Sequence, residues 1–478
     1  MPPVPFATQS YRHDSLPIAA QRAVNWYAER QPPDAKSQVT SHGSPGITTF
    51  ATCGAGPIRG FRMLGGLLYV VSGTSLYSIA STGTATEVGI GITGTGIVSI
   101  SENGNEIQIV NGTNGYLYDT TSGFRAITDT DFNAAHTTTY LDGFFLLAQA
   151  DSAQFFRSDL LDGSSYDALA FATKESKSGN VRAVVNVKQI AYVLGETAGS
   201  ELWNNQGAAN FPFQRIPGGT IDRGIISSHA HAQEDQTLFM VGEDRMAYKV
   251  AGTSLGRIST HAIERTWQKY TSVSDCFGLA YTDNGHKVIV FTFPTEQADL
   301  GDTTSWAYDI STGLWHEKLS FDMSGNPLGR WRANCAIEAY GKTFIGDAWS
   351  GKVGYLDGTV QTEFGDPMYA KATSPPYHAG DKALFHSDLV LDMETGVGIA
   401  SGQGSDPQVM LRVSDDGGTT YSPLEEWHSL GAQGRLTQPR WTRLGRTERG
   451  GIRVYEVTIS DPVKRTIIAA HADMKAGM

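Results

Sequence analysis

Short runs of alternating hydrophobic and polar residues, separated by glycine-containing turns, repeat along most of the chain. Residues 305–322, SWAYDISTGLWHEKLSFD, show the pattern clearly: WAYDI alternates, STG turns, and LWHEKLSF is extended again. Alternation with a period of two around a glycine-containing turn is typical of a β-hairpin. The pattern therefore predicts two short antiparallel strands here and a chain built mainly of such hairpins.

Similar phrases recur, each with an aromatic residue near its start and a second hairpin before it. The aromatic anchors are Tyr77, Tyr118, Phe156, Trp203, Tyr248, Tyr308 and Tyr355. Their spacings are 41, 38, 47, 45, 60 and 47 residues, and we assign the longest to an extra loop, PTEQADLGDT. Four strands in about 40–50 residues is the repeat of a β-propeller blade. We therefore predict an all-β chain with a β-propeller of about seven four-stranded blades over residues 57–370, in which each blade buries aromatic side chains against the next.

The two ends of the chain differ from this repeat. Residues 1–56 are expected to form an N-terminal arm that supplies a closing strand or docks on a partner. Residues 371–383, which include KATSPPYHAGDK, indicate a linker. Residues 384–478 alternate with period two between glycine-rich turns and predict an antiparallel β-sandwich.

Charge and composition narrow the function classes. The chain has 478 residues, with 37 Lys and Arg against 49 Asp and Glu, giving a net charge of −12. Such a chain does not wrap nucleic acid through bulk electrostatics, because like charges repel phosphates. Three widely spaced cysteines form neither a disulfide framework nor a zinc cluster and indicate reduced thiols in a cytosol. The N-terminus lacks signal-peptide character and no apolar run is long enough to span a bilayer, so we expect no membrane insertion.

The sequence contains few motifs that are typical of a catalytic or metal site. SDDGGTTY, residues 414–421, fits the Asp-box pattern of sialidase-type propellers, in which the carboxylate of Asp416 would stabilise a turn. His229 and His231 would point to the same face of a strand and could bind a metal, but no third ligand is evident. We expect no catalytic residue, metal or cofactor. Two alternatives remain open: a glycan-cleaving, sialidase-like propeller enzyme, and a monomeric carbohydrate-binding propeller.

An arginine run marks the C-terminal region. From residue 401 onwards there are 10 Lys and Arg against 9 Asp and Glu, whereas the rest of the chain is strongly acidic. Arg440, Arg443 and Arg446 are candidate docking residues for an acidic partner, because guanidinium groups bind carboxylates through two parallel hydrogen bonds. The alternative is a solvated or ion-paired strand face.

Both ends of the chain resemble a known family. The stretch from VMLRVSDDGGTTYS to VKRTIIAA resembles the C-terminal part of the packaged-DNA stabilisation proteins, or tail-hub (nozzle) proteins, of short-tailed bacteriophages, also described as podovirus tail accessory factors. The opening HDSLPIAAQRAVNWYAER resembles that family's Q-R-x-x-N-x-Y-x-E phrase, and SHGSPGITTF after it is similar too. In this sequence the phrase comprises Gln21, Arg22, Asn25, Tyr27 and Glu29.

The resemblance implies a structural, non-enzymatic virion protein. Such hubs form a homohexameric ring below the portal and its adaptor protein, extend the DNA exit channel, help to retain the packaged genome, and hold the tail needle and the tailspikes. DNA would pass through the channel without specific binding. Gln21, Arg22, Asn25 and Tyr27 would join the three arginines as candidate partner-docking residues. The expected location is the virion tail, assembled in the cytoplasm of a bacterial host.

Overall fold

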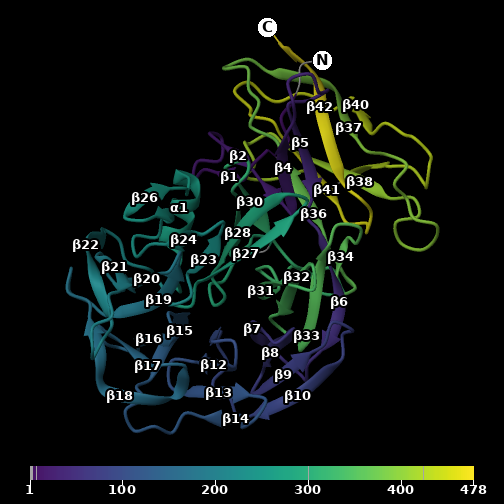
Figure 1. The fold of residues 1–478 in the computed structure, drawn as a ribbon. Helices are drawn as coiled ribbons and strands as arrows, with labels where there is room; N and C mark the ends of the chain where they lie inside the picture. Colours follow the sequence, from purple (N-terminus) through teal and green to yellow (C-terminus); the bar gives the residue numbers. More distant parts are fainter. Residues whose placement is uncertain (1–3, 7, 300, 424, 478) are drawn as a thin grey trace.

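The computed structural model describes residues 4–6, 8–299, 301–423 and 425–477. Over these residues the chain is almost entirely β-structure, with a single α-helix, α1 (His261–Lys269). The strands form seven blades arranged around a ring, with a sandwich of two sheets beside the ring (Figure 1). The predicted fold class, a β-propeller of about seven four-stranded blades with an antiparallel β-sandwich, is confirmed.

Blades 1 to 5 are separate sheets, each made of four consecutive antiparallel strands. Blade 1 contains β7 (Ile58–Leu64), β8 (Leu67–Ser72), β9 (Ser75–Ile79) and β10 (Ala85–Ile90), and blade 2 contains β11 (Ser99–Glu102), β12 (Glu106–Val110), β13 (Gly115–Asp119) and β14 (Gly123–Ala126). Blade 3 contains β15 (Ala135–Leu141), β16 (Phe144–Gln149), β17 (Gln154–Asp159) and β18 (Asp162–Thr173), and blade 4 contains β19 (Val181–Val187), β20 (Ile190–Gly195), β21 (Ser200–Asn205) and β22 (Phe213–Ile221). Blade 5 contains β23 (His231–Glu234), β24 (Thr237–Val241), β25 (Ala247–Ala251) and β26 (Ser254–Arg257). The first strand of each blade lies innermost. For example, β7 of blade 1 packs against β11 of blade 2 and against β31 (Ala333–Ala339), the first strand of the last blade.

The ring is closed by a strand from the N-terminal segment. Blade 6 comprises β27 (Phe277–Asp283), β28 (His286–Thr292), β29 (Ser305–Asp309) and β30 (Leu314–Lys318). Blade 7 comprises β31 (Ala333–Ala339), β32 (Lys342–Asp347) and β33 (Lys352–Asp357), completed by β6 (Gly46–Thr52) and extended by the short strands β34 (Thr362–Glu363) and β35 (Asp366–Pro367). β6 runs antiparallel to β33, with Ala51 opposite Val353. The last blade is therefore shared between both ends of the propeller segment.

The aromatic anchors occupy the same place in every blade, namely its third strand. They are Tyr77 on β9, Tyr118 on β13, Phe156 on β17, Trp203 on β21, Tyr248 on β25, Tyr308 on β29 and Tyr355 on β33. Some pair with a ring of the preceding blade: Tyr118 lies 5.2 Å from Tyr69, and Trp203 lies 5.0 Å from Phe155, between ring centroids. Each such pair contributes about 1 kcal/mol beyond its buried area. The repeat in the sequence thus reflects packing between neighbouring blades.

The long step between Tyr248 and Tyr308 contains a helix that the sequence analysis did not predict. α1 follows blade 5, and the hydroxyl of Thr260 accepts a hydrogen bond from the backbone N–H of Ile263 as an N-cap. Trp267 is fully buried on its inner face, 5.3 Å from the ring of Phe293. The extra length is therefore divided between α1 and the predicted loop.

The sandwich combines strands from both ends of the chain. One sheet contains β36 (Ala370–Thr373), β41 (Val454–Ile459), β38 (Gln408–Ser414) and β39 (Glu426–Ser429) in that order. The other contains β4 (Trp26–Arg30), β5 (Val39–Gly43), β42 (Thr466–Ala476), β37 (Leu384–Met393) and β40 (Arg440–Thr442). Trp26, Leu389, Trp441 and Tyr455 are buried in the shared core.

A short strand connects the propeller to the sandwich. β3 (Ala23–Val24) pairs in parallel with β30 of blade 6 and antiparallel with β36 of the sandwich, so one nine-stranded sheet runs through both. β1 (Tyr11–Arg12) and β2 (Ala20–Gln21) form a small separate sheet before it. The expected domain boundaries at residues 56, 370 and 383 divide the chain into consecutive segments. The sheets, in contrast, combine strands from the two ends of the chain. Within the described ranges, no helix has the length and hydrophobicity needed to cross a membrane.

Candidate functional site

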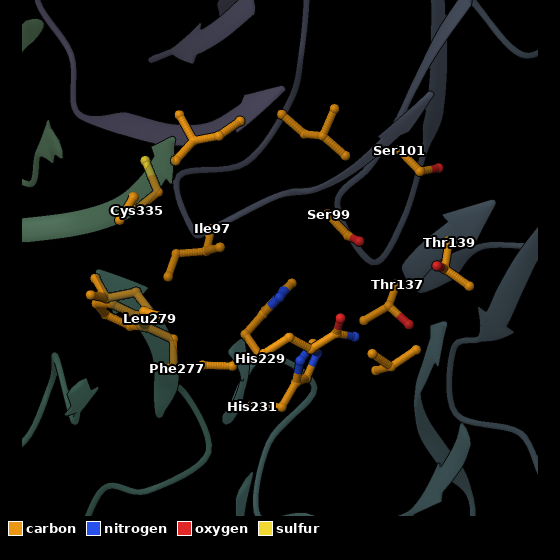
Figure 2. A pocket seen from close by; sticks show the side chains of 18 of the residues that line it. Ile97, Ser99, Ser101, Thr137, Thr139, His229, His231, Phe277, Leu279 and Cys335 are labelled. Atoms are coloured by element: carbon orange, nitrogen blue, oxygen red, sulfur yellow. The ribbon is translucent and has the colours of Figure 1, made fainter. Parts of the chain in front are cut away.

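The centre of the propeller holds a channel lined by the first strands of its blades. A cavity of about 620 Å³ lies here. Its wall carries hydroxyl groups from blades 2 and 3, apolar side chains from blade 6, and the imidazoles of His229 and His231 from blade 5 (Figure 2). Such a wall offers hydrogen bonds and little charge.

Among the described residues that line this channel, two are carboxylates, Glu234 and Glu338, and each has a partner of its own. Glu234 forms an ion pair with Lys287 at 2.9 Å, and the hydroxyl of Thr343 donates a hydrogen bond to Glu338. They come from different blades, β23 and β31. The lining therefore does not present the acidic cluster that the glycan-cleaving alternative requires.

His229 and His231 both lie in this wall, but only His231 belongs to a strand, β23, whereas His229 precedes it and forms an isolated bridge with Phe277. Removal from bulk water lowers the pKa of His229 to about 3 and that of His231 to about 4, so both imidazoles are neutral at pH 7. Across the part of the chain that the structure describes, no group of three or more His, Cys, Asp or Glu side chains is placed to hold a metal ion.

The N-terminal phrase Q-R-x-x-N-x-Y folds into the junction between the propeller and the sandwich. The Nε of Arg22 donates to both carboxylate oxygens of Glu317, at 3.1 and 3.2 Å, and its Nη1 lies 2.8 Å from Asp302. The side chains of Arg22 and Glu317 are only 12% and 4% exposed. Although burial opposes the charge, the two carboxylates raise the pKa of Arg22. This ion pair ties the N-terminal segment to the last strand of blade 6.

Asn25 is the second contact at this junction. It is fully buried and adopts a left-handed backbone conformation, with φ of 56°, which Asn tolerates better than most residues. Its side-chain amide donates to the carbonyl oxygens of Leu319 at 2.7 Å and Tyr369 at 2.8 Å, and its Oδ1 accepts from the Leu319 N–H at 3.1 Å. One side chain thus connects β3, blade 6 and the segment that leads into β36.

Tyr27 and Gln21 complete the phrase. Tyr27 is buried on β4 with its ring 4.9 Å from that of His286 in blade 6, and burial raises the pKa of its hydroxyl. Gln21 lies half-buried on β2, opposite Tyr11. Arg22, Asn25 and Tyr27 are therefore engaged inside the folded chain, and the docking role expected for these four residues remains a prediction.

The same junction contains a buried lysine that the sequence analysis missed. Lys318 is fully buried, and its ammonium group lies 4.8 Å from the centre of the Trp331 ring and 5.1 Å from that of Tyr281. Among the described residues its Nζ has no hydrogen-bond partner, and burial lowers its pKa to about 8. The run HEK, residues 316–318, was the available signal, because three polar residues in succession are unusual in a buried strand.

The predicted docking arginines lie along one edge of the sandwich. The chain from Arg440 to Arg446 follows β37, with the Arg443 N–H donating to the Ser387 carbonyl at 2.7 Å and Arg446 opposite Phe385. All three arginine side chains are exposed. Arg440 pairs with Asp388, whereas Arg443 and Arg446 make no ion pair with any described residue. Arg440 is thus ion-paired, as the alternative interpretation of the arginine run expected. Docking of a partner by the three arginines remains a prediction.

Asp416 acts as a turn residue, as the Asp-box pattern suggested. It accepts hydrogen bonds from the Ser414 hydroxyl at 2.7 Å and from the backbone N–H groups of Thr419 and Thr420, both at 2.9 Å. Burial is the largest single effect and raises the pKa of Asp416, but the hydrogen bonds from Thr420, Ser414 and Thr419 together outweigh it and lower the pKa to about 2. Its carboxylate is thus committed to the loop after β38.

Structural comparison gives many propellers of low sequence identity. The extracellular domain of BT4673 from B. thetaiotaomicron is 10% identical with a TM-score of 0.42, over 82% of this chain and 48% of that one, so the chain spans about half of that protein's length. BamB from Moraxella catarrhalis is 12% identical with a TM-score of 0.38, over 71% and 98%. A streptogramin B lyase is 12% identical with a TM-score of 0.39, over 70% and 98%. Overlaps at this level carry no information about function, and no curated protein matches the sequence.

The fold is that of a propeller–sandwich protein in which Arg22, Asn25 and Tyr27 make contacts between the two parts. Residues 5–361 match the family described as bacteriophage P22 Gp10, beta-propeller, and residues 372–475 match bacteriophage P22 Gp10, beta-sandwich. The chain belongs to the bacteriophage P22 Gp10 family, and it is a structural protein of a phage tail.

Proposed function

We propose that this chain is the hub, or nozzle, of a short phage tail. Six copies would form a ring below the portal and its adaptor protein, extend the DNA exit channel, retain the packaged genome, and carry the tail needle and the tailspikes. Family membership supports a tail role, and the finer assignments are our proposal.

The observation that carries the proposal is the junction between the two parts of the chain. A shared nine-stranded sheet, the Arg22–Glu317 pair and the Asn25 hydrogen bonds hold the propeller and the sandwich together. A ring subunit that must withstand the pressure of packaged DNA needs such a rigid connection, because loosely linked domains move relative to each other by default. The net charge of −12 per copy further favours a channel that DNA passes without sticking.

We also propose that the chain has no enzymatic activity. Both carboxylates described in the propeller channel are held by partners, and the Asp416 carboxylate is used by its own turn. This distribution supports a structural role for the propeller rather than glycan cleavage.

A deletion experiment tests the proposed function. Phage particles produced without this protein should package DNA and then lose it, giving empty heads that lack needles and tailspikes, and the protein supplied in trans should restore full heads. Particles that stay full and keep their needle and tailspikes without it would contradict the proposal.

A further inference from the structure

The outer rim of blade 3 exposes large apolar side chains. Leu160 and Leu161, in the turn before β18, are 62% and 58% exposed, and Leu169 and Phe171 on β18 are 70% and 38% exposed. Phe171 pairs with Phe156 while Tyr166 pairs with Ser158, so the residues between them bulge outwards from the sheet. Clustered apolar groups of this kind on an edge strand mark an interaction surface.

Blade 3 and its flanking loops carry much of the acidity of the chain. Residues 129–175 contain eight Asp and Glu against two Lys and Arg, a net charge of −6 out of −12 for the whole chain. Lys174 is buried, and Arg157 already pairs with Asp159. Asp142, Asp162 and Asp167 are exposed and make no ion pair with any described residue. We call this surface the blade-3 rim; its members are Leu160, Leu161, Leu169, Phe171, Asp142, Asp159, Asp162 and Asp167.

The outer edge of the sandwich has the opposite charge. Residues 427–450 contain five arginines and a single acidic residue, Glu448, a net charge of +4. All five guanidinium groups are on exposed residues, and of these only Arg440 forms an ion pair with a described residue. We call this surface the arginine edge; its members are Arg435, Arg440, Arg443, Arg446 and Arg449, with Trp427 and Leu436.

The arginine edge also exposes apolar groups. Trp427 on β39 is 65% exposed and Leu436 is 82% exposed. β39 and β40 are the outermost strands of the two sandwich sheets and lie together, since the rings of His428 and Trp441 are 5.2 Å apart. Both surfaces thus combine exposed apolar side chains with uncompensated charge of one sign, and the signs are opposite.

The two surfaces lie at opposite ends of the molecule: β18 and β40 are at the lower left and upper right of Figure 1. They cannot meet within one chain. From their charge complementarity we propose that the blade-3 rim binds the arginine edge of a second copy of this chain. Because the two surfaces differ, the contact is head-to-tail, and such a contact closes into a ring when its rotation permits. This inference rests on the self-association in the proposed function and specifies which surfaces form it.

Charge-reversing substitutions at two residues of each surface test the contact. Variant one carries Asp162→Arg and Asp167→Arg, and variant two carries Arg443→Asp and Arg446→Asp. All four residues are exposed and outside every ion pair of the described chain. Within the same part of the chain, the carboxylates of Asp162 and Asp167 accept hydrogen bonds only from residues two positions further along, so both variants should melt within a few degrees of wild type. Glu87→Arg, on the exposed outer strand β10 of blade 1, is the control for an added positive charge.

Sedimentation of the full-length chain at low ionic strength, over a series of concentrations, gives the readout. Wild type and Glu87→Arg should self-associate, and each variant alone should associate at least about tenfold more weakly, because its altered surface loses most of the charge that attracts the other surface. A mixture of the two variants should recover association, since the unaltered rim of variant two can bind the unaltered arginine edge of variant one. Salt should weaken the wild-type contact.

The inference is overturned if wild type does not associate, if the variants associate as well as wild type, or if the mixture fails to recover. Mass spectrometry of gradient-purified phage tails keeps this result separate from the proposed function. Protein that is present in tails but shows no rescue contradicts the contact alone, whereas protein that is absent from tails contradicts the proposed function.

Discussion

Arg22 and Glu317 are 295 positions apart in the chain, yet the guanidinium group of the first donates to both carboxylate oxygens of the second inside the folded protein. Arg22 directly precedes β3, and Glu317 lies opposite Val24 of β3 on the last strand of blade 6. The pair therefore reinforces the point where the propeller sheet continues into the sandwich. Stability of the whole chain should depend on it.

Arg22→Met should lower the free energy of unfolding by about 3–5 kcal/mol, because it leaves the buried carboxylate of Glu317 without its partner. Arg12→Met is the matched control. Arg12 pairs with the same Asp302 but is 43% exposed, so its loss should cost less than about 1 kcal/mol. Urea denaturation followed by tryptophan fluorescence measures both. Equal, small effects would show that the junction does not depend on Arg22.

The closing strand should be as important to the ring as any strand within a blade. Ile47 on β6 is 1% exposed and packs with Ile345 and Phe364, so Ile47→Ala should cost about 2–5 kcal/mol. Ile90→Ala, on the outer strand of blade 1 where the side chain is 67% exposed, should cost less than about 0.5 kcal/mol. In Ile47→Ala, hydrogen exchange should accelerate first in β6 and β33. Uniform exchange across all blades would contradict closure through β6.

Local patterns in the sequence predicted the blades but not the way in which the chain ends join them. Alternation and the repeated aromatic anchors reflect contacts within a blade or with the next one, which lie close in sequence. Pairing of β5 with β42, or of β3 with β30, joins residues hundreds of positions apart, and no local signal encodes it. α1 was missed because its nine residues are fewer than the roughly 11–18 over which a helical pattern can be recognised.

The roles of the candidate functional residues were predictable from the sequence only where their contacts are local. Asp416 was predictable as a turn residue because its partners lie within four positions. The importance of Asn25 came only from a resemblance, since its contacts with Leu319 and Tyr369 depend on the complete fold. The edge position of the exposed arginines likewise required the structure, because exposure is a property of the sheet order rather than of the run itself.

Lys318 should make stability depend on pH. Its pKa in the folded chain, about 8, lies below the unfolded value of 10.5, so the folded state binds fewer protons between these values. The buried charge of Lys318 should therefore destabilise the folded wild type most below pH 8. The free energy of unfolding of wild type should rise as the pH increases from 8 to 10.5. Lys318→Met should be more stable than wild type at pH 7, and the difference should shrink by on the order of 3 kcal/mol by pH 10.5. Thermal or urea unfolding at both pH values measures this; a constant difference would contradict the assignment.

The channel carboxylates should be dispensable. Glu234→Gln and Glu338→Gln, separately and together, should leave infectivity within about twofold of wild type, because the partly exposed Glu234–Lys287 ion pair and the single hydrogen bond from Thr343 to Glu338 each contribute little. A plaque assay with the variants supplied in trans gives the result. A loss of infectivity with normal tails and an intact fold would favour the glycan-cleaving alternative instead.

Cryo-electron microscopy of purified phage particles tests the central claim most directly. The account predicts a ring of propeller–sandwich subunits in the tail, on the axis of DNA exit, with β3 joining the two parts of each subunit as it does in the isolated chain. A tail without this density would contradict it, as would propellers and sandwiches separated in space.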